Sequence, residues 1–116
     1  MEIKIIKDSI SKKELTDIAE AQFGSFMKAV VDVNQEIMAL GGEMHADGEA
    51  VLMEKEGSKR EDVWGINLYP EKEGEELIEF DSMINIKPFC NNRSRNIEDL
   101  KTREKIRAIV NKLITK

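Results

Sequence analysis

Acidic side chains in two separate segments are the first candidates for chemistry in this sequence. Glu79 and Asp81 are two positions apart, so in an extended strand both carboxylates project from the same face. Asp32 lies in another segment and joins them only if the two segments become neighbours. Such an oxygen-rich cluster suits a magnesium or manganese ion, and phosphoester hydrolysis would follow from it. The alternative is an ordinary solvated strand face.

His45 is the only histidine, and it lies in a second group of potential metal ligands. Glu43, His45 and Asp47 occupy alternate positions, so an extended backbone places all three on one side. A mixed imidazole and carboxylate site suits zinc, manganese or iron, and histidine is the usual acid–base group near neutral pH. The simpler interpretation is that Asp47 caps a helix while His45 makes a hydrogen bond near a chain turn. Two alternatives therefore stay open, a bound divalent metal and no cofactor at all.

A third group combines side-chain amides, a hydroxyl and two guanidinium groups, and consists of Asn92, Arg93, Ser94 and Arg95. The group precedes the last predicted helix, and both arginine side chains and helix N-terminal amides bind phosphate or carboxylate. The alternative is that these arginines pair with Glu79, Asp81 or the acidic segment 71–76. The same stretch therefore predicts either an anion site or a set of internal ion pairs.

Charge is distributed unevenly along the chain. The net charge is -5 at pH 7, but residues 87–116 hold nine Lys or Arg against three Asp or Glu, a balance of +6. Residues 1–86 therefore carry nine bases against twenty acids, a balance of -11. The basic C-terminal segment can pack beside the acidic body, or it can bind nucleic acid as a basic patch. We favour the first interpretation because overall acidity repels polyanions.

The segment 63–87 is the one around which the other elements are expected to be arranged. Apolar residues alternate with small or polar ones along 63–69 and again along 77–86, which is the period of a half-buried strand. Pairing Tyr69 with Leu77 places residues of like polarity opposite each other. The segment therefore predicts a hairpin with one apolar face and one polar face that is free to meet solvent or a partner. The polar face consists of Asn67, Glu79, Asp81 and Asn85.

The N-terminal part of the chain predicts a strand, a helix and a strand pair. Residues 2–7 have the composition of a short strand. Ser11 and Glu14 form a capping box that starts a helix, and Gly24 is suited to end it. Residues 27–40 predict a second hairpin, with one continuous helix as the alternative.

Two further helices are predicted on either side of the central hairpin. Asp47 can cap a short helix over 49–56 that would direct Ala50 and Met53 inward, with Val51 or Leu52 beside them. After the hairpin, a last helix begins beyond Asn96 or Asp99. Its apolar residues recur at the spacing of a core-facing stripe, and they are Ile106, Ile109, Val110, Leu113 and Ile114.

These elements predict an α+β fold. The economical arrangement is a two-layer sandwich in which a mainly antiparallel sheet of four to five strands is covered on one face by two main helices and a short third. A chain of 116 residues suits a single domain over 1–116. No apolar run predicts a signal peptide or membrane span, and the single Cys90 excludes an intrachain disulfide, so we expect a cytoplasmic protein with no membrane association.

Several short segments of the sequence resemble segments of a known family. They occupy residues 10–15, 45–47, 64–70, 78–85 and 92–94. Over nearly its full length the chain resembles a small prokaryotic family, bacterial or archaeal, that is carried as a domain of unknown function. The resemblance supports one cytosolic domain and implies no particular activity or substrate.

Three functional hypotheses follow from these patterns. The first is a non-catalytic binding or assembly module that uses the central hairpin and the basic segment, with a second copy or another protein as partner. The second is a metal-dependent phosphoester hydrolase that uses the acidic cluster. The third is nucleic-acid binding through the basic C-terminal segment.

Overall fold

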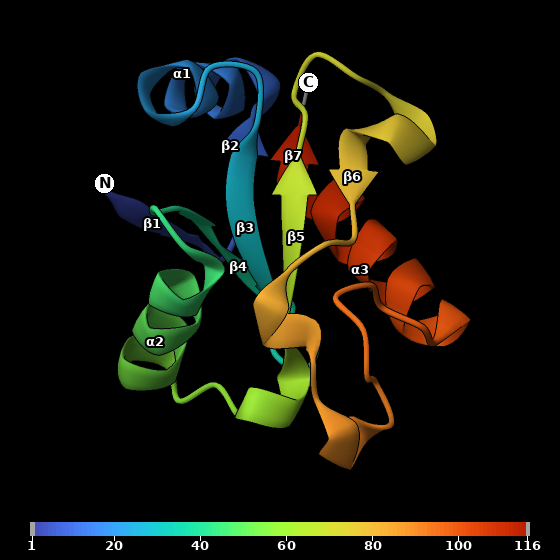
Figure 1. Cartoon of the computed structure of the whole chain (residues 1–116). Helices are drawn as coiled ribbons and strands as arrows, with labels where there is room; N and C mark the ends of the chain where they lie inside the picture. The colour runs from blue at the N-terminus through green and yellow to red at the C-terminus, as the bar shows by residue number, and fades with distance from the viewer. Residues whose placement is uncertain (1, 116) are drawn as a thin grey trace.

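A five-stranded antiparallel sheet forms the centre of the structure, a computed structural model that describes residues 2–115 (Figure 1). The strands lie in the order β1-β4-β3-β5-β6. Their bounds are Ile3–Ile6 for β1, Met27–Asp32 for β3, Ile37–Gly41 for β4, Val63–Leu68 for β5 and Ile78–Glu79 for β6. The long middle strands β3 and β5 are buried along nearly their whole length, because both faces of the sheet are covered.

Two helices cover one face of the sheet. They are α1 (Lys12–Gln22) and α3 (Leu100–Leu113). The predicted capping box starts α1, since the Ser11 hydroxyl accepts a hydrogen bond from the Glu14 amide at 3.1 Å. Asp99 caps α3, and the apolar stripe of that helix joins the main core. Two short strands, β2 (Ile10–Ser11) and β7 (Ile114–Thr115), pair in parallel and tie the start of α1 to the end of α3.

The third helix, α2 (His45–Glu56), lies on the opposite face. Its buried Leu52 packs with Val30, Ala39 and Val63 in a second, smaller core. The α+β class and the antiparallel sheet are confirmed, but the expectation that all helices cover one face is corrected. The reason is that β3 and β4 are apolar on both sides, so a solvated second face would leave Val30 and Ala39 exposed to water.

The structure corrects the predicted start and the predicted inner face of α2. The helix begins at His45, and Asp47 is not its cap but its third residue, whose carboxylate accepts a hydrogen bond from the Met44 amide at 3.3 Å. Ala50 and Met53 are exposed, and Leu52 is the buried residue. Within the described residues, no helix combines the length and the apolar content needed to cross a membrane.

Residues 27–40 form a hairpin and not a continuous helix. Strands β3 and β4 pair with Asp32 opposite Ile37. The Asp32 carboxylate accepts hydrogen bonds from the amides of Asn34 and Gln35, at 2.9 and 3.0 Å, and so holds the turn closed. Glu36 completes the turn with a φ of 59°.

The central hairpin has the predicted register but is shorter than predicted. Leu68 is opposite Ile78, and Asn67 is opposite Glu79. The second strand ends at Glu79, and the expected continuation to residue 86 is wrong: the chain leaves the sheet and forms a short 3-10 turn over Met83–Asn85, followed by another over Pro88–Cys90. Side chains from this irregular segment supply the hydrogen bonds that a longer strand would have made to β5.

Candidate functional site

A cavity of about 330 Å³ opens between the first turn of α2, strands β3 and β5, and the segment that follows β6. This volume is at the lower end of the range for small-molecule sites. We call it the central pocket. Its lining combines six charged or ionisable side chains with apolar ones, and consists of Phe26, Lys28, Met44, His45, Ala46, Asn67, Tyr69, Glu79, Asp81, Ser82, Met83, Ile84 and Arg95.

Asn67 lies at the floor of the central pocket. Its side-chain nitrogen donates to Glu79 Oε1 at 2.8 Å and, more weakly, to the Asp81 carbonyl at 3.4 Å. Since both partners only accept hydrogen bonds, the Asn67 oxygen must face the other way. That oxygen is buried and has no hydrogen-bond partner among the described residues. With the whole residue 8% exposed, the pocket floor contains an unsatisfied acceptor.

His45 closes one side of the central pocket. Its Nε2 lies 2.8 Å from the Ile66 carbonyl oxygen, which can only accept, so Nε2 carries a proton and Nδ1 is the acceptor when the ring is neutral. Burial lowers the pKa of His45, with Lys28 acting in the same direction, while the Ile66 carbonyl, Asp81 and Asn67 oppose the shift. The imidazole is therefore mostly neutral at pH 7.

Asp81 and Arg95 form an ion pair at the rim of the central pocket. Arg95 Nε donates to Asp81 Oδ1 at 2.6 Å. The Arg95 carbonyl in turn accepts hydrogen bonds from the Ser82 amide and the Asn85 side chain, at 3.1 and 3.0 Å. The sequence left open that both arginines pair with these acids, and this is confirmed for Arg95 alone, since Arg93 forms no ion pair with them among the described residues. The ion pair anchors the segment after β6 to the loop before α3.

Glu79 carries a second carboxylate at the rim, and its partners are neutral. Besides Asn67, the Tyr69 hydroxyl donates to Glu79 Oε1 at 3.2 Å. Burial, followed by the nearby Glu79 carboxylate, raises the pKa of Tyr69. The phenol is therefore a fixed donor at neutral pH.

Close packing at Gly65 shapes the wall behind these groups. A Cβ atom at this position would lie 2.5 Å from Ser82 Oγ and 3.1 Å from His45 Cδ2. The atom of the His45 ring nearest to Gly65 is therefore the carbon Cδ2 and not a ring nitrogen. The Ser82 hydroxyl itself accepts a hydrogen bond from the Ile84 amide at 3.2 Å. In this arrangement no hydrogen bond activates Ser82 as a nucleophile among the described residues.

The predicted metal ligands are only partly brought together. His45, Glu79 and Asp81 line the central pocket, whereas Asp32 lies in the β3–β4 turn, where it accepts a hydrogen bond from Ser58 Oγ at 2.6 Å. Asp47 is occupied at the start of α2. Among residues 2–115, no group of three or more His, Cys, Asp or Glu side chains could hold a metal ion.

The predicted anion group at 92–95 is arranged around an internal carboxylate. The amides of Arg93 and Ser94 donate to Glu98 Oε2 at 3.0 and 3.2 Å, and the Ser94 hydroxyl donates to the same oxygen at 2.9 Å. These bonds lower the pKa of Glu98, with the Ser94 hydroxyl as the largest contributor. Asn92 is buried and donates to three backbone carbonyls. Of the four residues, only Arg95 reaches the central pocket.

The polar face predicted for the hairpin is corrected by burial. Asn67 and Asn85 are buried, and only Glu79 and Asp81 are accessible at the pocket rim. Sequence reasoning also missed Lys28 and Tyr69 as pocket residues. Lys28 is opposite Asn67 across β3 and β5, so the strand order, which the sequence did not reveal, was the signal that would have found it.

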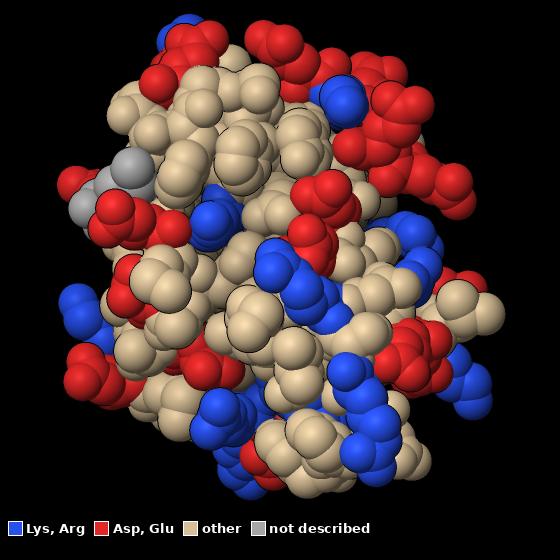
Figure 2. Space-filling view, viewed as in Figure 1, with Lys and Arg blue, Asp and Glu red and all other residues tan. Residues whose placement is uncertain are grey.

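Charges of both signs meet on the face that contains the central pocket. Figure 2 shows acidic side chains gathered over the connection between β5 and β6, at the upper right, and red and blue side chains side by side near the centre. The basic residues of α3 are partly engaged within the protein, since the guanidinium groups of Arg103 and Arg107 each lie 5.1 Å from the centre of the Phe80 ring. The basic C-terminal segment therefore packs at least partly against the body of the protein.

Comparison with known proteins assigns the chain to a family. Residues 4–113 match the family described as Protein of unknown function (DUF5674), which covers nearly the whole chain, so the protein belongs to this family. No curated protein matches the chain, and no solved structure matches it.

Proposed function

We propose that this member of the DUF5674 family is a non-catalytic binding module, and that its ligand is a small molecule held in the central pocket. The observation that carries the proposal is the convergence of His45, Asn67 and Glu79 on one cavity, with an unsatisfied acceptor at its floor. These side chains come from α2, β5 and β6, which are held together because α2 packs on β5 in the smaller core and β5 pairs with β6. A pre-formed pocket with a few fixed polar groups is the usual form of a ligand site.

The arrangement of the polar groups supports binding over catalysis. His45 Nε2 is held by a backbone carbonyl, and Asp81 is held by Arg95. Among the described residues, no hydrogen bond connects His45 to Ser82 or to either rim carboxylate. A general base normally lies within hydrogen-bond reach of the group it activates. The hydrolase hypothesis additionally needs ligands that the fold places apart, in the β3–β4 turn and at the start of α2.

Methyl NMR of methionine-labelled protein tests the proposal with an internal control. Met44 and Met83 line the central pocket and are 60% and 64% exposed, whereas Met53 is 42% exposed and lies outside it. A fragment library that includes amines, acids and neutral heterocycles should yield compounds that shift the first two resonances saturably and leave Met53 in place. If every fragment leaves Met44 and Met83 unmoved, the cavity is not a ligand site.

A pair of matched variants strengthens this test. Ala46 lines the central pocket from the first turn of α2, and Ala50 lies one turn further along the same side of the helix, outside the pocket. Both are exposed. Ala46→Phe should fill the cavity and abolish the fragment-induced shifts, while Ala50→Phe should retain them. Equal effects of the two substitutions would point to a general disturbance of α2.

Self-association is a second candidate role, because large apolar side chains are exposed on the segment that follows β6. Three such side chains lie at every third position of this irregular segment. They are Met83, Ile86 and Phe89, which are 64%, 40% and 67% exposed. Such residues are typical of protein–protein contact surfaces. Light scattering at two protein concentrations should show a dimer whose population falls on dilution and in Phe89→Ser. A monomeric mass at both concentrations rules out the homodimer.

A further inference from the structure

Three neighbouring strands place a positive, a neutral and a negative side chain in one row along the central pocket. Lys28 of β3 is opposite Asn67 of β5, and Asn67 is opposite Glu79 of β6. Residues in register on neighbouring strands project from the same face of a sheet, and all three line the cavity. Since neighbouring strands are about 4.8 Å apart, the backbones of Lys28 and Glu79 are roughly 10 Å apart. The row therefore presents opposite charges across the width of a small molecule.

Neither charge at the ends of this row is neutralised within the part of the chain that the structure describes. Glu79 accepts hydrogen bonds from Asn67 and Tyr69, which are neutral, and has no cationic partner there. The Lys28 ammonium lies 5.1 Å from the centre of the Phe23 ring and has no carboxylate partner among the same residues. The other two charges of the pocket, on Asp81 and Arg95, already form a pair. A full positive and a full negative charge thus remain for a ligand.

The first turn of α2 adds to the positive end. His45 and Ala46 line the pocket, and their amides donate no hydrogen bond to another residue of the described chain. Amides at a helix N-terminus carry partial positive charge and bind carboxylates. Lys28 lines the same cavity as His45 and Ala46, so its side chain and this turn face one space. A carboxylate there would meet both the ammonium and the helix terminus.

The middle of the row is neutral and polar. The Asn67 nitrogen is held by Glu79, and the Asn67 oxygen is the buried acceptor without a partner. Burial of an unsatisfied acceptor costs free energy, and a positively charged donor nearby would offset part of this cost. The negative end of the row is the Glu79 carboxylate, which favours an ammonium group, and the Asn67 oxygen is a separate acceptor in the middle of the row.

We propose that the central pocket binds a small zwitterion of the amino-acid type, with its ammonium at Glu79 and its carboxylate at Lys28 and the first turn of α2. This inference rests on the proposed function and adds the class of ligand. An apolar side chain of the ligand lies against Met44, Met83 and Ile84, which belong to the apolar part of the lining. The two charges of the ligand compensate the two unpaired charges of the protein, so both are required.

Calorimetric titration with L-leucine and two derivatives tests this requirement. N-acetyl-L-leucine lacks the ammonium, and L-leucinamide lacks the carboxylate. We expect L-leucine to bind and each derivative to bind at least about tenfold more weakly, since each derivative leaves either Glu79 or Lys28 without an oppositely charged partner. Equal affinity for L-leucine and either derivative overturns the proposal, as does the absence of heat with L-leucine.

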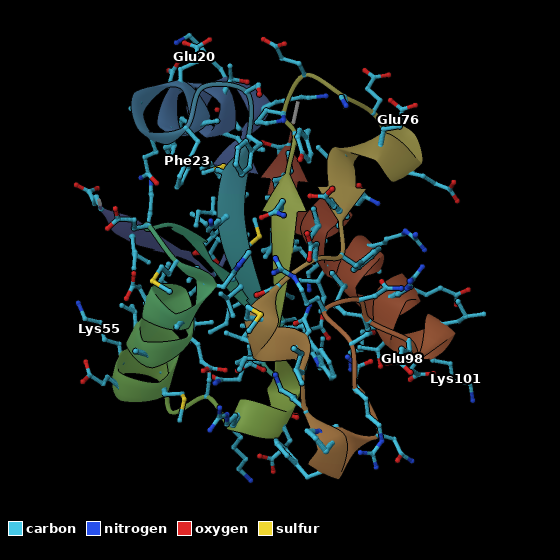
Figure 3. All side chains as sticks on the ribbon, viewed as in Figure 1. Glu20, Phe23, Lys55, Glu76, Glu98 and Lys101 are labelled. Atoms are coloured by element: carbon cyan, nitrogen blue, oxygen red, sulfur yellow. The ribbon has the colours of Figure 1, made fainter. Side chains whose placement is uncertain are left out.

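Charge-removing variants identify the residue that binds each end of the ligand. Glu79→Gln should weaken L-leucine binding about tenfold and leave the affinity for N-acetyl-L-leucine unchanged. Lys28→Met should likewise weaken L-leucine and leave L-leucinamide unchanged. The controls are Glu76→Gln and Lys55→Met, whose side chains are exposed and point away from the pocket in Figure 3. A loss of the same size in the controls, or equal losses for ligand and derivative, contradicts the assignment.

The methionine resonances separate failure of this inference from failure of the proposed function. If other fragments shift Met44 and Met83 but L-leucine does not, the pocket binds ligands of another class and only the zwitterion assignment is wrong. If no compound shifts them, both proposals are wrong. Circular dichroism of each variant establishes that it is folded before its affinity is compared.

Discussion

The side chain of Asn85 takes the place of a β-strand beside Gly65. Its oxygen accepts a hydrogen bond from the Gly65 amide at 2.8 Å, and its nitrogen donates to the Gly65 carbonyl at 2.9 Å. This is the pair of bonds that a residue of a neighbouring antiparallel strand would exchange. The sheet therefore loses no backbone hydrogen bonds at this position although β6 has ended at Glu79, and the segment after β6 is free to form the pocket wall.

Replacement of Asn85 should destabilise the protein strongly. Asn85→Ala leaves both Gly65 groups and the Arg95 carbonyl without this partner in a buried position, so we expect a loss of about 2–4 kcal/mol in the free energy of unfolding. Urea denaturation measures the change. Asn111→Ala, at an exposed position of α3, is the control and should change stability little. If Asn85→Ala reduces the free energy of unfolding no more than Asn111→Ala does, water replaces the buried side chain without cost and the prediction is wrong.

Gly65→Ala should disturb the pocket wall through a steric collision. The new Cβ would lie 2.5 Å from Ser82 Oγ and 2.6 Å from Ser82 Cβ, and overpacking of this kind costs about 1–3 kcal/mol. The second substitution Ser82→Gly removes both colliding atoms. The double variant should therefore be more stable than the sum of the two single losses predicts. Additive losses in urea denaturation would show that the collision is relieved elsewhere.

Lys87 should be required for stability despite the cost of burying its charge. The side chain is 1% exposed, and its ammonium donates to the carbonyls of Val63 and Ile84 at 2.7 and 2.8 Å. It also lies 4.6 Å from the centre of the Trp64 ring. Lys87→Met should reduce the free energy of unfolding by about 2–4 kcal/mol, since two buried carbonyls lose a charged donor.

Tryptophan fluorescence provides an independent readout of the same substitution. Because the ammonium lies against the only tryptophan, Lys87→Met should also change the emission of the folded protein. Lys101→Met is the control, since Lys101 is exposed near the start of α3 (Figure 3). Unchanged stability of Lys87→Met would mean that relief of the buried charge offsets the lost hydrogen bonds, because burial lowers the pKa of Lys87.

His45 should make the protein less stable in weak acid. Burial lowers the pKa of His45 in the folded protein, whereas in the unfolded chain it is near 6.5. Between these two values the unfolded chain binds more protons, so the free energy of unfolding falls as pH decreases from about 6.5 through the folded pKa. Lys28 and Asp81 face the ring with opposing effects, and Asn67 and the Ile66 carbonyl favour its protonated form.

The difference between wild type and His45→Gln isolates this contribution. Glutamine retains a donor for the Ile66 carbonyl but does not titrate. Urea denaturation between pH 5 and 8 measures the free energy of unfolding of both proteins. Their difference should be constant above about pH 7, and at lower pH the wild type should lose stability relative to the variant. A difference that is flat over the whole range contradicts the lowered pKa.

Local sequence signals predicted the elements that local interactions form. The capping box at Ser11, the hairpin register around Leu68 and Ile78, and the buried stripe of α3 are all confirmed. Each depends on residues within a few positions of one another or on the regular period of one element. Glu79 and Asp81 were selected from their spacing as metal ligands, and both line the central pocket, but their role in a site stays a prediction.

The errors concern features that depend on contacts between distant segments. The end of β6 was missed because alternation continues to residue 86, although Asn85 now binds Gly65 as a side chain and not as a strand residue. The second helical layer was missed because Val30 and Ala39 fit a strand equally well whether water or a helix covers them. Only the structure shows that they pack against α2. Asp32 was expected beside the other acids, but Ser58, far along the chain, holds it at the turn.

By itself, the sequence determined the α+β class, the antiparallel pairing of the hairpins and the chemical types available to the site, because propensity, periodicity and capping act over a few residues. Only the tertiary structure decided which polar groups share the pocket. The order β3-β5-β6 places Lys28, Asn67 and Glu79 in one row, and α2 brings His45 to it. Strand order is set by the total burial of apolar surface on both faces of the sheet, and that sum cannot be read from any single segment.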